Sequence, residues 1–325
     1  MSLLAFLAGC AHEPPEDVTD SPTGSASHLV YEQIDCDGWI GEAGLLVGPN
    51  GTVVLWDVGN DGHADAVREA LVRQAGAEVA DFTVITHFHG DHGGSLDKLF
   101  GAGVDLGELI VRDAEPIDAS SQDVLAALDG RPTTALCRAG TCTLPRRIDL
   151  GEGAALDLVA ANGQVLGLPF PSLLPDDDDG ENARSIVGVV TWGDFAMVLP
   201  GDLTGGGKGT PDVESHVAAG LPSPARADVV VLGHHGIDSS TNAAWIDRWF
   251  PPDGAEHHAI VGANGSYLDA PADEVLDRLR GRTTAVWATR AGSLAGADAL
   301  LHDVGGPVVV DVTASGAAFT AGSRF

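Results

Sequence analysis

Basic residues, aromatic residues and long apolar runs are all scarce in this chain, and each scarcity excludes a class of protein. Lys and Arg together number 17 against 47 Asp and Glu, which leaves a formal net charge of −30 at pH 7. Proteins that hold long nucleic acids neutralise phosphates with a basic surface, so stable binding of a long nucleic acid is not expected. A short phosphodiester held by metal ions is not excluded. The simplest role of the negative charge is to keep the chain soluble.

Aromatic residues make up 5% of the 325 residues, whereas glycine occurs 43 times, which indicates a fold rich in turns and in small-residue packing. Beyond the amino terminus, no apolar stretch approaches the roughly 20 residues that a membrane-spanning helix needs. The sequence also contains no Gly-x-Ser-x-Gly, the turn that exposes the nucleophile of α/β-hydrolases. The usual serine hydrolase is therefore excluded.

The first ten residues, MSLLAFLAGC, form a short apolar segment that ends in a cysteine. Its last four residues, Leu7 to Cys10, resemble the lipobox of bacterial lipoproteins, in which the cysteine is acylated and becomes the new first residue. No Lys or Arg precedes the segment and the apolar run is short, so an incidental apolar end is the alternative. We expect a lipoprotein-type signal over residues 1–10 and a flexible linker over 11–27. The protein would then be exported and anchored by lipid to the bacterial cell envelope, on the periplasmic or outer surface.

Three cysteines remain if Cys10 carries lipid: Cys36, Cys137 and Cys142. The last two close a small loop around a glycine, and an oxidising compartment could bridge them. Two reduced thiols are the alternative. Because no matching cysteine pair occurs elsewhere, a four-cysteine zinc site is not expected.

Strand and helix patterns alternate along the rest of the chain, which predicts a single α/β domain over residues 28–325. The weakly patterned segment 112–153 is expected to be peripheral. A hairpin is expected over 43–47 and 52–56, and helices over 64–75, 95–100 and 272–280. Further strands are expected over 82–86, 185–191, 195–199, 228–232, 259–262, 285–288 and 308–312.

Residues 86–94, THFHGDHGG, place three histidines and one aspartate on a turn directly after an apolar strand. Neutral imidazoles and a carboxylate suit divalent metals, and no thiolate lies nearby to close a structural zinc site. His87 and His89 flank one residue and can face the same side, while Asp91 and His92 can face a second point. One loop can therefore contribute to two metal sites. Histidines paired with local acids on a surface loop are the alternative.

This motif resembles the His-x-His-x-Asp-His signature of the metallo-β-lactamase fold superfamily, and the resemblance is collinear over about residues 31–294. Residues 55–60, LWDVGN, resemble the early strand that ends in an Asp and a Gly beneath the site. Residues 199–202, LPGD, resemble the strand whose final carboxylate bridges two metals. Residues 228–236, DVVVLGHHG, resemble the late strand that leads to the last histidine ligand. The resemblance implies a four-layer αββα sandwich.

The HHG form of the last motif, with Ser239 and Ser240 after it, resembles the hydrolase domain of the ComEC/Rec2 competence proteins and their free-standing relatives. Residues 181–185, ENARS, and the late positions Asn264, Tyr267, Pro271 and 289–292 continue that likeness. Residues 35–40 depart from the early Asp-Val-Gly-x-Gly-Asp of this branch. Ala270 stands where a histidine precedes the late proline. The membrane-channel segments of the full competence proteins are not present in this sequence.

Carried over residue by residue, the resemblance implies that His87 and His89 bind a first metal, with Asp202 as the bridge to a second. Asp91, His92 and His234 would bind the second metal. His235 is the competing candidate for that last ligand, and as a non-ligand it would hydrogen-bond substrate or shuttle a proton. Asn182 and Ser185 stand where a first-metal histidine is often found, which could make that metal labile or favour Mn over Zn.

The implied activity is hydrolysis with two divalent metal ions, Zn or Mn, which lower the pKa of a bound water towards about 7. Asp91 would also orient that nucleophile, and His235 would be the second catalytic side chain. A phosphodiester or nucleotide-type substrate follows from the ComEC/Rec2 branch. Ester, lactone or β-lactam hydrolysis is the alternative within hydrolases. A metal-binding or scaffold module without turnover is the alternative from another class.

Overall fold

The computed structural model describes residues 27–36, 41–113, 121–138, 141–172, 174–264, 270–313, 316 and 318–322. The predicted signal segment, residues 11–26 of the predicted linker, and Tyr267 lie outside the described residues. Among the helices within these ranges, none is long and apolar enough to cross a membrane.

The first of two large sheets has eight strands in the order β20-β19-β1-β2-β3-β4-β5-β6. Neighbours from β20 to β3 pair antiparallel, and neighbours from β3 to β6 pair parallel. The strands are β1 (Leu29–Gln33), β2 (Ala43–Val47), β3 (Val53–Val58), β4 (Phe82–Ile85), β5 (Glu108–Val111), β6 (Thr133–Ala135), β19 (Val308–Thr313) and β20 (Ala318–Gly322).

The second sheet has the order β12-β11-β10-β13-β14-β15-β16-β17-β18, with β9 paired to β10. Its strands from β14 to β18 run parallel. They are β9 (Arg146–Gly151), β10 (Ala154–Ala161), β11 (Gln164–Val165), β12 (Leu168–Pro169), β13 (Val187–Trp192), β14 (Phe195–Leu199), β15 (Val229–Val231), β16 (His258–Asn264), β17 (Ala285–Arg290) and β18 (Leu301–Asp303). A separate hairpin, β7 (Cys137–Arg138) and β8 (Thr141–Cys142), carries a disulfide between its two cysteines.

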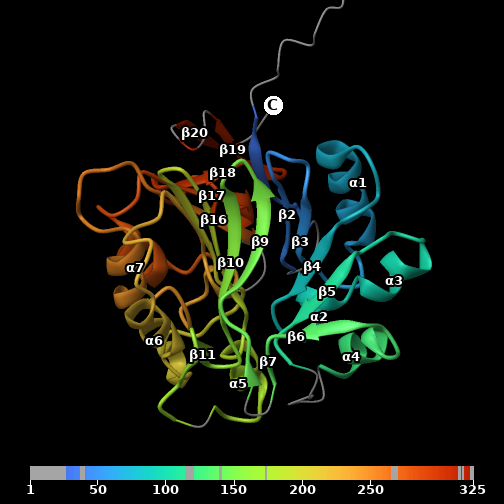
Figure 1. Ribbon diagram of the computed structural model, residues 1–325. Coiled ribbons are helices and arrows are strands. Elements are labelled where there is room, and N and C mark those ends of the chain that lie inside the picture. Colours follow the sequence, from blue (N-terminus) through green and yellow to red (C-terminus); the bar gives the residue numbers. More distant parts are fainter. Residues whose placement is uncertain are drawn as a thin grey trace, which may run out of the picture.

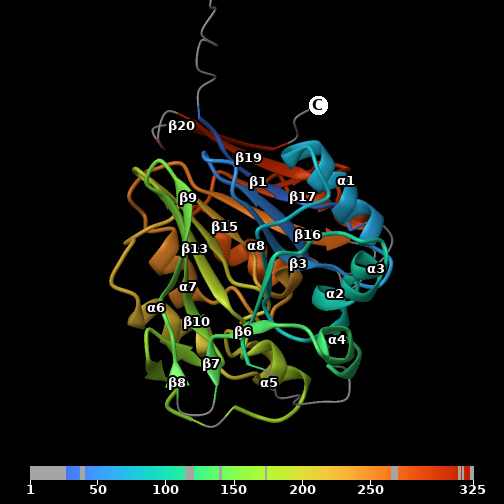
Figure 2. The same cartoon turned by 45° about the vertical axis from the view of Figure 1, so that its right-hand side comes forward.

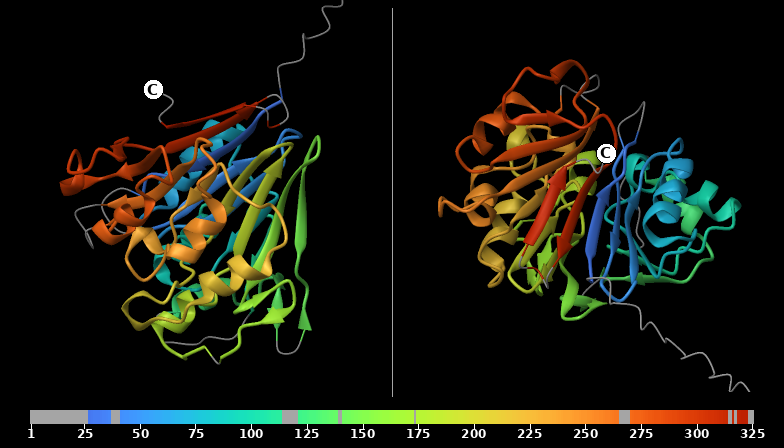
Figure 3. Two further views of the ribbon diagram at one scale, coloured as in Figure 1. Left: turned by 90° about the vertical axis from the view of Figure 1, so that its left-hand side faces the viewer. Right: turned by 90° about the horizontal axis from the view of Figure 1, so that it is seen from above.

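Helices cover the outer face of each sheet, so the molecule has four layers (Figures 1 and 3). One apolar core lies between the sheets, a second lies under the helices of the first sheet, and a third lies under those of the second sheet. This is the αββα sandwich that the sequence predicts. The helices are α1 (Ala64–Ala75), α2 (Gly90–Gly93), α3 (Leu96–Gly101), α4 (Gln122–Leu128), α5 (Asp178–Asn182), α6 (Val213–Gly220), α7 (Ala243–Trp249) and α8 (Asp273–Leu279), with short 3₁₀ turns η1 (Gly207–Gly209), η2 (His234–Gly236) and η3 (Gly292–Leu294).

Local sequence signals explain the elements that were predicted well. Helix α1 spans the predicted residues and ends at Gly76, which adopts φ of 78°, a left-handed conformation that glycine enters without steric cost. Strands β2 and β3 form the predicted hairpin, and β14 has the predicted bounds. The other predicted strands and helices are present with ends shifted by up to two residues.

The expectation that residues 112–153 are peripheral is wrong. Arg112 is fully buried, and Ile148 and Leu150 of β9 belong to the core between the sheets. The sequence did not reveal this because β9 reads Arg-Arg-Ile-Asp-Leu-Gly, which buries only every second residue. The charge of the buried Arg112 is compensated by Glu181 of α5, which is far away in sequence.

Candidate metal centre

The predicted ligands come together where strands of both sheets end. Figure 2 shows α2, which carries Asp91 and His92, beside β3 of the first sheet. Strand β4 of the first sheet leads into the histidine loop, and β14 and β15 of the second sheet lead to Asp202 and to the His234–His235 pair. Gly201 allows the close approach, since a Cβ there would lie 2.9 Å from the side chain of Thr86. The carbonyl of Gly201 also accepts a hydrogen bond from the His234 amide at 3.2 Å. Carboxyl ends of parallel strands are where α/β folds place ligands.

Two groups of side chains could each hold a metal ion, with all their ligating atoms within 4.8 Å of one another. The first group is His87, His92 and Asp202, and the second is Asp91, His92 and His235. Oδ2 of Asp202 lies 3.2 Å from Nε2 of His92 and 3.9 Å from Nε2 of His87. Nε2 of His235 lies 3.3 Å from Oδ2 of Asp91 and 3.7 Å from Oδ2 of Asp202. Asp202 therefore stands between the two groups, as a bridging carboxylate would.

His89 lies beside the first group, with its Nδ1 3.2 Å from Nε2 of His87. Ser185, which with Asn182 was expected to stand where a first-metal histidine is often found, has its hydroxyl 3.4 Å from Nδ1 of His87 and accepts a hydrogen bond from the Asp202 amide at 3.1 Å. It therefore lies against two members of the first group.

The two adjacent histidines of η2 occupy different places. His235 lies with Asp91 and His92, the position that the sequence analysis gave first to His234. Nε2 of His234 lies 3.7 Å from Oδ2 of Asp202 and 3.3 Å from the amide nitrogen of Asn182, while its Nδ1 lies 2.7 Å from the hydroxyl of Ser239. Both histidines have positive φ, 49° for His234 and 54° for His235. Such strained non-glycine backbone persists where the surroundings hold it, and it clusters at functional sites.

Asp57, at the end of β3, fixes the orientation of His92. Its Oδ2 lies 2.9 Å from Nδ1 of His92, and its carboxylate accepts hydrogen bonds from the amide and the hydroxyl of Thr86 at 2.8 Å. Metal-binding histidines commonly donate their second ring N–H to a carboxylate in this way, which fixes the tautomer. The sequence analysis placed Asp57 beneath the site but did not predict that it orients His92.

A buried ion pair holds the backbone of the histidine loop. Glu181 of α5 accepts hydrogen bonds from the amide of Phe88 at 2.8 Å and from Nε and Nη2 of Arg112 at 2.9 and 2.7 Å. The Arg112 guanidinium also lies over the Phe88 ring, 4.4 Å from its centroid. Glu181 and Arg112 are both fully buried, so this pair anchors the residue between His87 and His89. No sequence pattern pointed to Arg112.

The loop after His235 is held by a buried carboxylate of α6. Glu214 is fully buried, and its two oxygens accept hydrogen bonds from the amides of Thr241 and Asn242 at 2.6 and 2.8 Å. Asn242 in turn caps α7 by accepting from the Trp245 amide. This carboxylate therefore connects α6 to the turn between η2 and α7.

Glu214→Ala is expected to lower the free energy of unfolding by about 2–3 kcal/mol, because two buried amide donors lose their acceptor. Urea unfolding followed by circular dichroism measures this. The matched control is Glu69→Ala, since Glu69 is exposed on α1 and its loss should change stability by less than about 0.5 kcal/mol. Equal stability of the two variants would show that the Glu214 bonds do not hold the loop.

The buried polar atoms of the site fit divalent cations. Within the described residues, Oδ1 of Asp202, Oδ1 of Asn182, and Nε2 of His92 and of His235 make no hydrogen bond of good geometry although they are buried. An unsatisfied buried polar atom costs about 1–3 kcal/mol. Imidazole nitrogens and carboxylate oxygens are donors that Zn²⁺ and Mn²⁺ accept, so ions bound here would remove that cost.

The charges of the site favour the same interpretation. Burial alone would raise the pKa of Asp202, but His92, His235 and His234 hold it well below its usual value. Burial alone would lower the pKa of His235, but Asp202 and Asp91 raise it to about 9. Burial lowers the pKa of His87 well below its usual value and that of His234 to about 4. His235 is therefore protonated at neutral pH in the metal-free protein, whereas His234 is neutral.

No family model matches the chain, and no curated protein matches it. Among solved structures, the chain is similar to a metallo-β-lactamase of Cronobacter sakazakii with an HARLDQ motif, with 18% identity, coverage of 58% of this chain and 70% of that chain, and a TM-score of 0.38. It is also similar to the Rm3 metallo-β-lactamase, with 16% identity, coverage of 64% and 77%, and a TM-score of 0.37.

A third solved structure is CmlA, a diiron β-hydroxylase from Streptomyces venezuelae, with 14% identity and a TM-score of 0.39. The match covers 82% of this chain but only 45% of CmlA. Two lactamases and a hydroxylase catalyse different reactions, so the matches concern the fold alone. The narrower resemblance to the ComEC/Rec2 hydrolase domain stays a prediction.

Proposed function

We propose that this protein is a metal-dependent hydrolase with two divalent ions, Zn or Mn, on either side of Asp202. The observation that carries the proposal is the convergence of histidines from two loops that are far apart in sequence on one buried carboxylate, Asp202. A scaffold module without turnover is disfavoured because His87, Asp91, His92 and Asp202 of the predicted set lie in these groups, with His235 in the place predicted for His234.

In this proposal His87 and His89 hold the first metal, and Asp91, His92 and His235 hold the second. Two ions held this way would supply a water of lowered pKa and would stabilise the oxygen charge that develops in hydrolysis. The side chain of Asp91 is 26% exposed, so its carboxylate is placed to orient an incoming water.

His234 is then free for the proton-transfer role that the sequence analysis gave to His235. Its side chain is 17% exposed and its Nδ1 lies against the Ser239 hydroxyl, so Nε2 faces the cluster. A neutral imidazole there can accept a proton at Nε2 and pass it on. Asn182 stands beside that nitrogen and can orient the ring or the substrate.

The proposed substrate is a short phosphodiester or a nucleotide, and the support for it is the branch resemblance. Acidic residues around the site limit its size. Asp177 caps α5, and Asp178 and Asp179 lie in its first turn. These acids would repel a long polyanion. The same acids favour the second candidate, an uncharged or singly charged ester, lactone or β-lactam.

We further propose that the protein is exported and anchored by its acylated Cys10. The disulfide between Cys137 and Cys142 supports this, because disulfides persist in oxidising compartments outside the cytosol. Fractionation of the native host tests it, with the protein expected in the membrane fraction and the Cys10→Ala variant in the soluble fraction. A wild-type protein in the soluble cytosolic fraction would contradict the proposal.

Turnover of two model substrates tests the reaction class. Pure protein, before and after treatment with a chelator and re-addition of Zn²⁺ or Mn²⁺, is assayed with bis-p-nitrophenyl phosphate and with a chromogenic lactam. We expect hydrolysis of the phosphodiester that the chelator abolishes and the metal restores. Chelator-sensitive turnover of the lactam alone would select the second candidate. Turnover that resists complete metal removal would contradict a metal-dependent mechanism.

Activity is expected to fall below about pH 6. The ligand histidines must be neutral to bind a metal, and the pKa of His235 is raised to about 9 in the metal-free protein, so a proton must leave as the ion enters. Lower pH therefore favours the protonated, metal-free state. Zinc affinity and kcat/KM, both measured from pH 5 to 8, should rise together. A flat profile of both quantities would contradict this expectation.

A further inference from the structure

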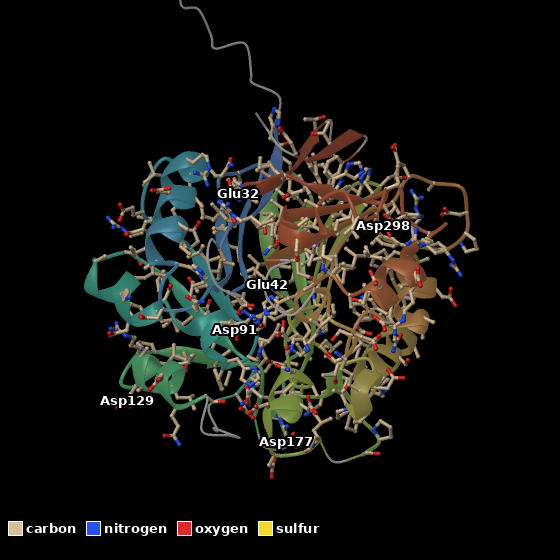
Figure 4. The ribbon with its side chains drawn as sticks, turned by 180° about the vertical axis from the view of Figure 1, so that it is seen from behind. Glu32, Glu42, Asp91, Asp129, Asp177 and Asp298 are labelled. Atoms are coloured by element: carbon tan, nitrogen blue, oxygen red, sulfur yellow. A yellow bond between two sulfur atoms is a disulfide. The ribbon has the colours of Figure 1, made fainter. Side chains whose placement is uncertain are left out.

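A buried glutamate beside the second ligand group has no part in the function proposed above. Glu42 precedes β2, its side chain is 1% exposed, and within the described residues neither carboxylate oxygen has a hydrogen-bond partner. Its backbone is well anchored, since its amide donates to the Asp91 carbonyl and its carbonyl accepts from the Gly59 amide, both at 2.9 Å. Figure 4 shows Glu42 beside Asp91 where the two halves of the molecule meet.

The nearest ring nitrogen to this carboxylate belongs to His235. Oε2 of Glu42 lies 3.9 Å from Nδ1 of His235, within ion-pair distance, and the Gly262 carbonyl lies 3.3 Å from the same nitrogen. The other ring nitrogen, Nε2, faces Asp91 and Asp202. The imidazole of His235 therefore stands between Glu42 on one side and the second ligand group on the other.

The charges around Glu42 determine whether its buried carboxylate is stable in the ionised form. Burying a carboxylate without a partner is unfavourable. Burial is the largest cause that raises the pKa of Glu42 to about 8; His235 and His92 lower this pKa, and Asp202 and Asp57 raise it. Positive charge on the histidine side of the site therefore stabilises the ionised carboxylate.

We propose that Glu42 is a positioning residue for the second metal: together with the Gly262 carbonyl, its carboxylate favours the proton on Nδ1 of His235, so that Nε2 presents its lone pair to the ion. This inference depends on the proposed function, because it requires a metal at His235. On the other side of the group, Asp57 faces Nδ1 of His92 at hydrogen-bond distance, 2.9 Å, against 3.9 Å for Glu42 and His235. A carboxylate behind a ligand histidine raises the basicity of the ring and fixes its tautomer, and its loss weakens metal binding by about 10–100-fold.

The test is zinc titration of the metal-free protein in competition with a colorimetric chelator, for the wild type, Glu42→Gln and Glu32→Gln. Glu32 is the matched control, a buried glutamate on β1 that bonds Arg73 and Gln74 away from the ligands. We expect Glu42→Gln to weaken one of two zinc dissociation constants by about 10–100-fold and to leave the other unchanged. Glu32→Gln should leave both constants unchanged. Unchanged constants in Glu42→Gln, or equal losses in both variants, would overturn the inference.

A second measurement reads the tautomer of His235 directly in the wild type. In the zinc-loaded wild type, nitrogen-15 correlation spectra of the histidine rings should show His235 protonated at Nδ1, with a strongly deshielded proton; Glu42→Gln should shift that signal. His235 protonated at Nε2 would overturn the inference. A wild type that binds no zinc would instead refute the proposed function. If the wild type binds two zinc ions but Glu42→Gln leaves the His235 signal unchanged, only the inference about Glu42 is refuted.

Discussion

Asp202→Asn is expected to lower kcat/KM by at least about 1,000-fold, which corresponds to roughly 4 kcal/mol of transition-state stabilisation. Asp202 lies within 4 Å of His87, His92, His234 and His235, so both proposed metals depend on its charge. An amide of the same shape keeps the packing but removes the negative charge that balances two cations. Metal content should fall from two ions per chain to one or none, as measured by plasma mass spectrometry after gel filtration.

The control is Asp228→Asn at the other end of β15. Asp228 is also buried, but its carboxylate accepts a hydrogen bond from the Ala196 amide at 2.8 Å and faces no ligand. Its loss should reduce stability and leave metal content and kcat/KM of the folded protein near the wild-type values. If Asp202→Asn kept two metals and full activity, Asp202 would not be a bridge.

His235→Ala and His234→Ala are expected to differ although the residues are adjacent. His235→Ala should lose the second metal and lower kcat/KM by about 1,000-fold, because its Nε2 lies within the group formed with Asp91 and His92. His234→Ala should keep both metals and lower kcat/KM by only about 10–100-fold, because it acts beside the ions on proton transfer or substrate orientation. Metal content and steady-state kinetics of both variants measure this difference.

The reverse result would restore the first interpretation of the sequence. Loss of a metal in His234→Ala with retention in His235→Ala would make His234 the last ligand and His235 the proton carrier. Circular dichroism of the two metal-free variants controls for damage to η2, where three successive residues adopt positive φ of 49°, 54° and 77°.

The sequence was sufficient for the parts of this protein that depend on local patterns. The His-x-His-x-Asp-His loop after an apolar strand predicted the cluster, and strand-helix alternation with Gly76 as a stop predicted α1 and the layered fold. These signals are short in range: a hydrophobic period, a cap, or a dense group of ligands.

Long-range partners could not be read from the sequence. Arg112 lies in a weakly patterned segment, and only its pairing with Glu181, 69 positions later, shows why it is buried. Glu42 likewise meets His235 only through the fold. The choice between His234 and His235 depends on backbone angles in a three-residue turn, and no propensity rule fixes two consecutive left-handed non-glycine residues.

Crystals grown with Zn²⁺ and measured at the zinc absorption edge test the central claim most directly. We predict two anomalous peaks, one on each side of Asp202, each with nitrogen and oxygen ligands at about 2.0–2.2 Å. His87 and His89 should contact the first, and Asp91 and His235 the second. An empty cluster in zinc-soaked crystals, or a single ion held without Asp202, would contradict a dinuclear centre in this protein.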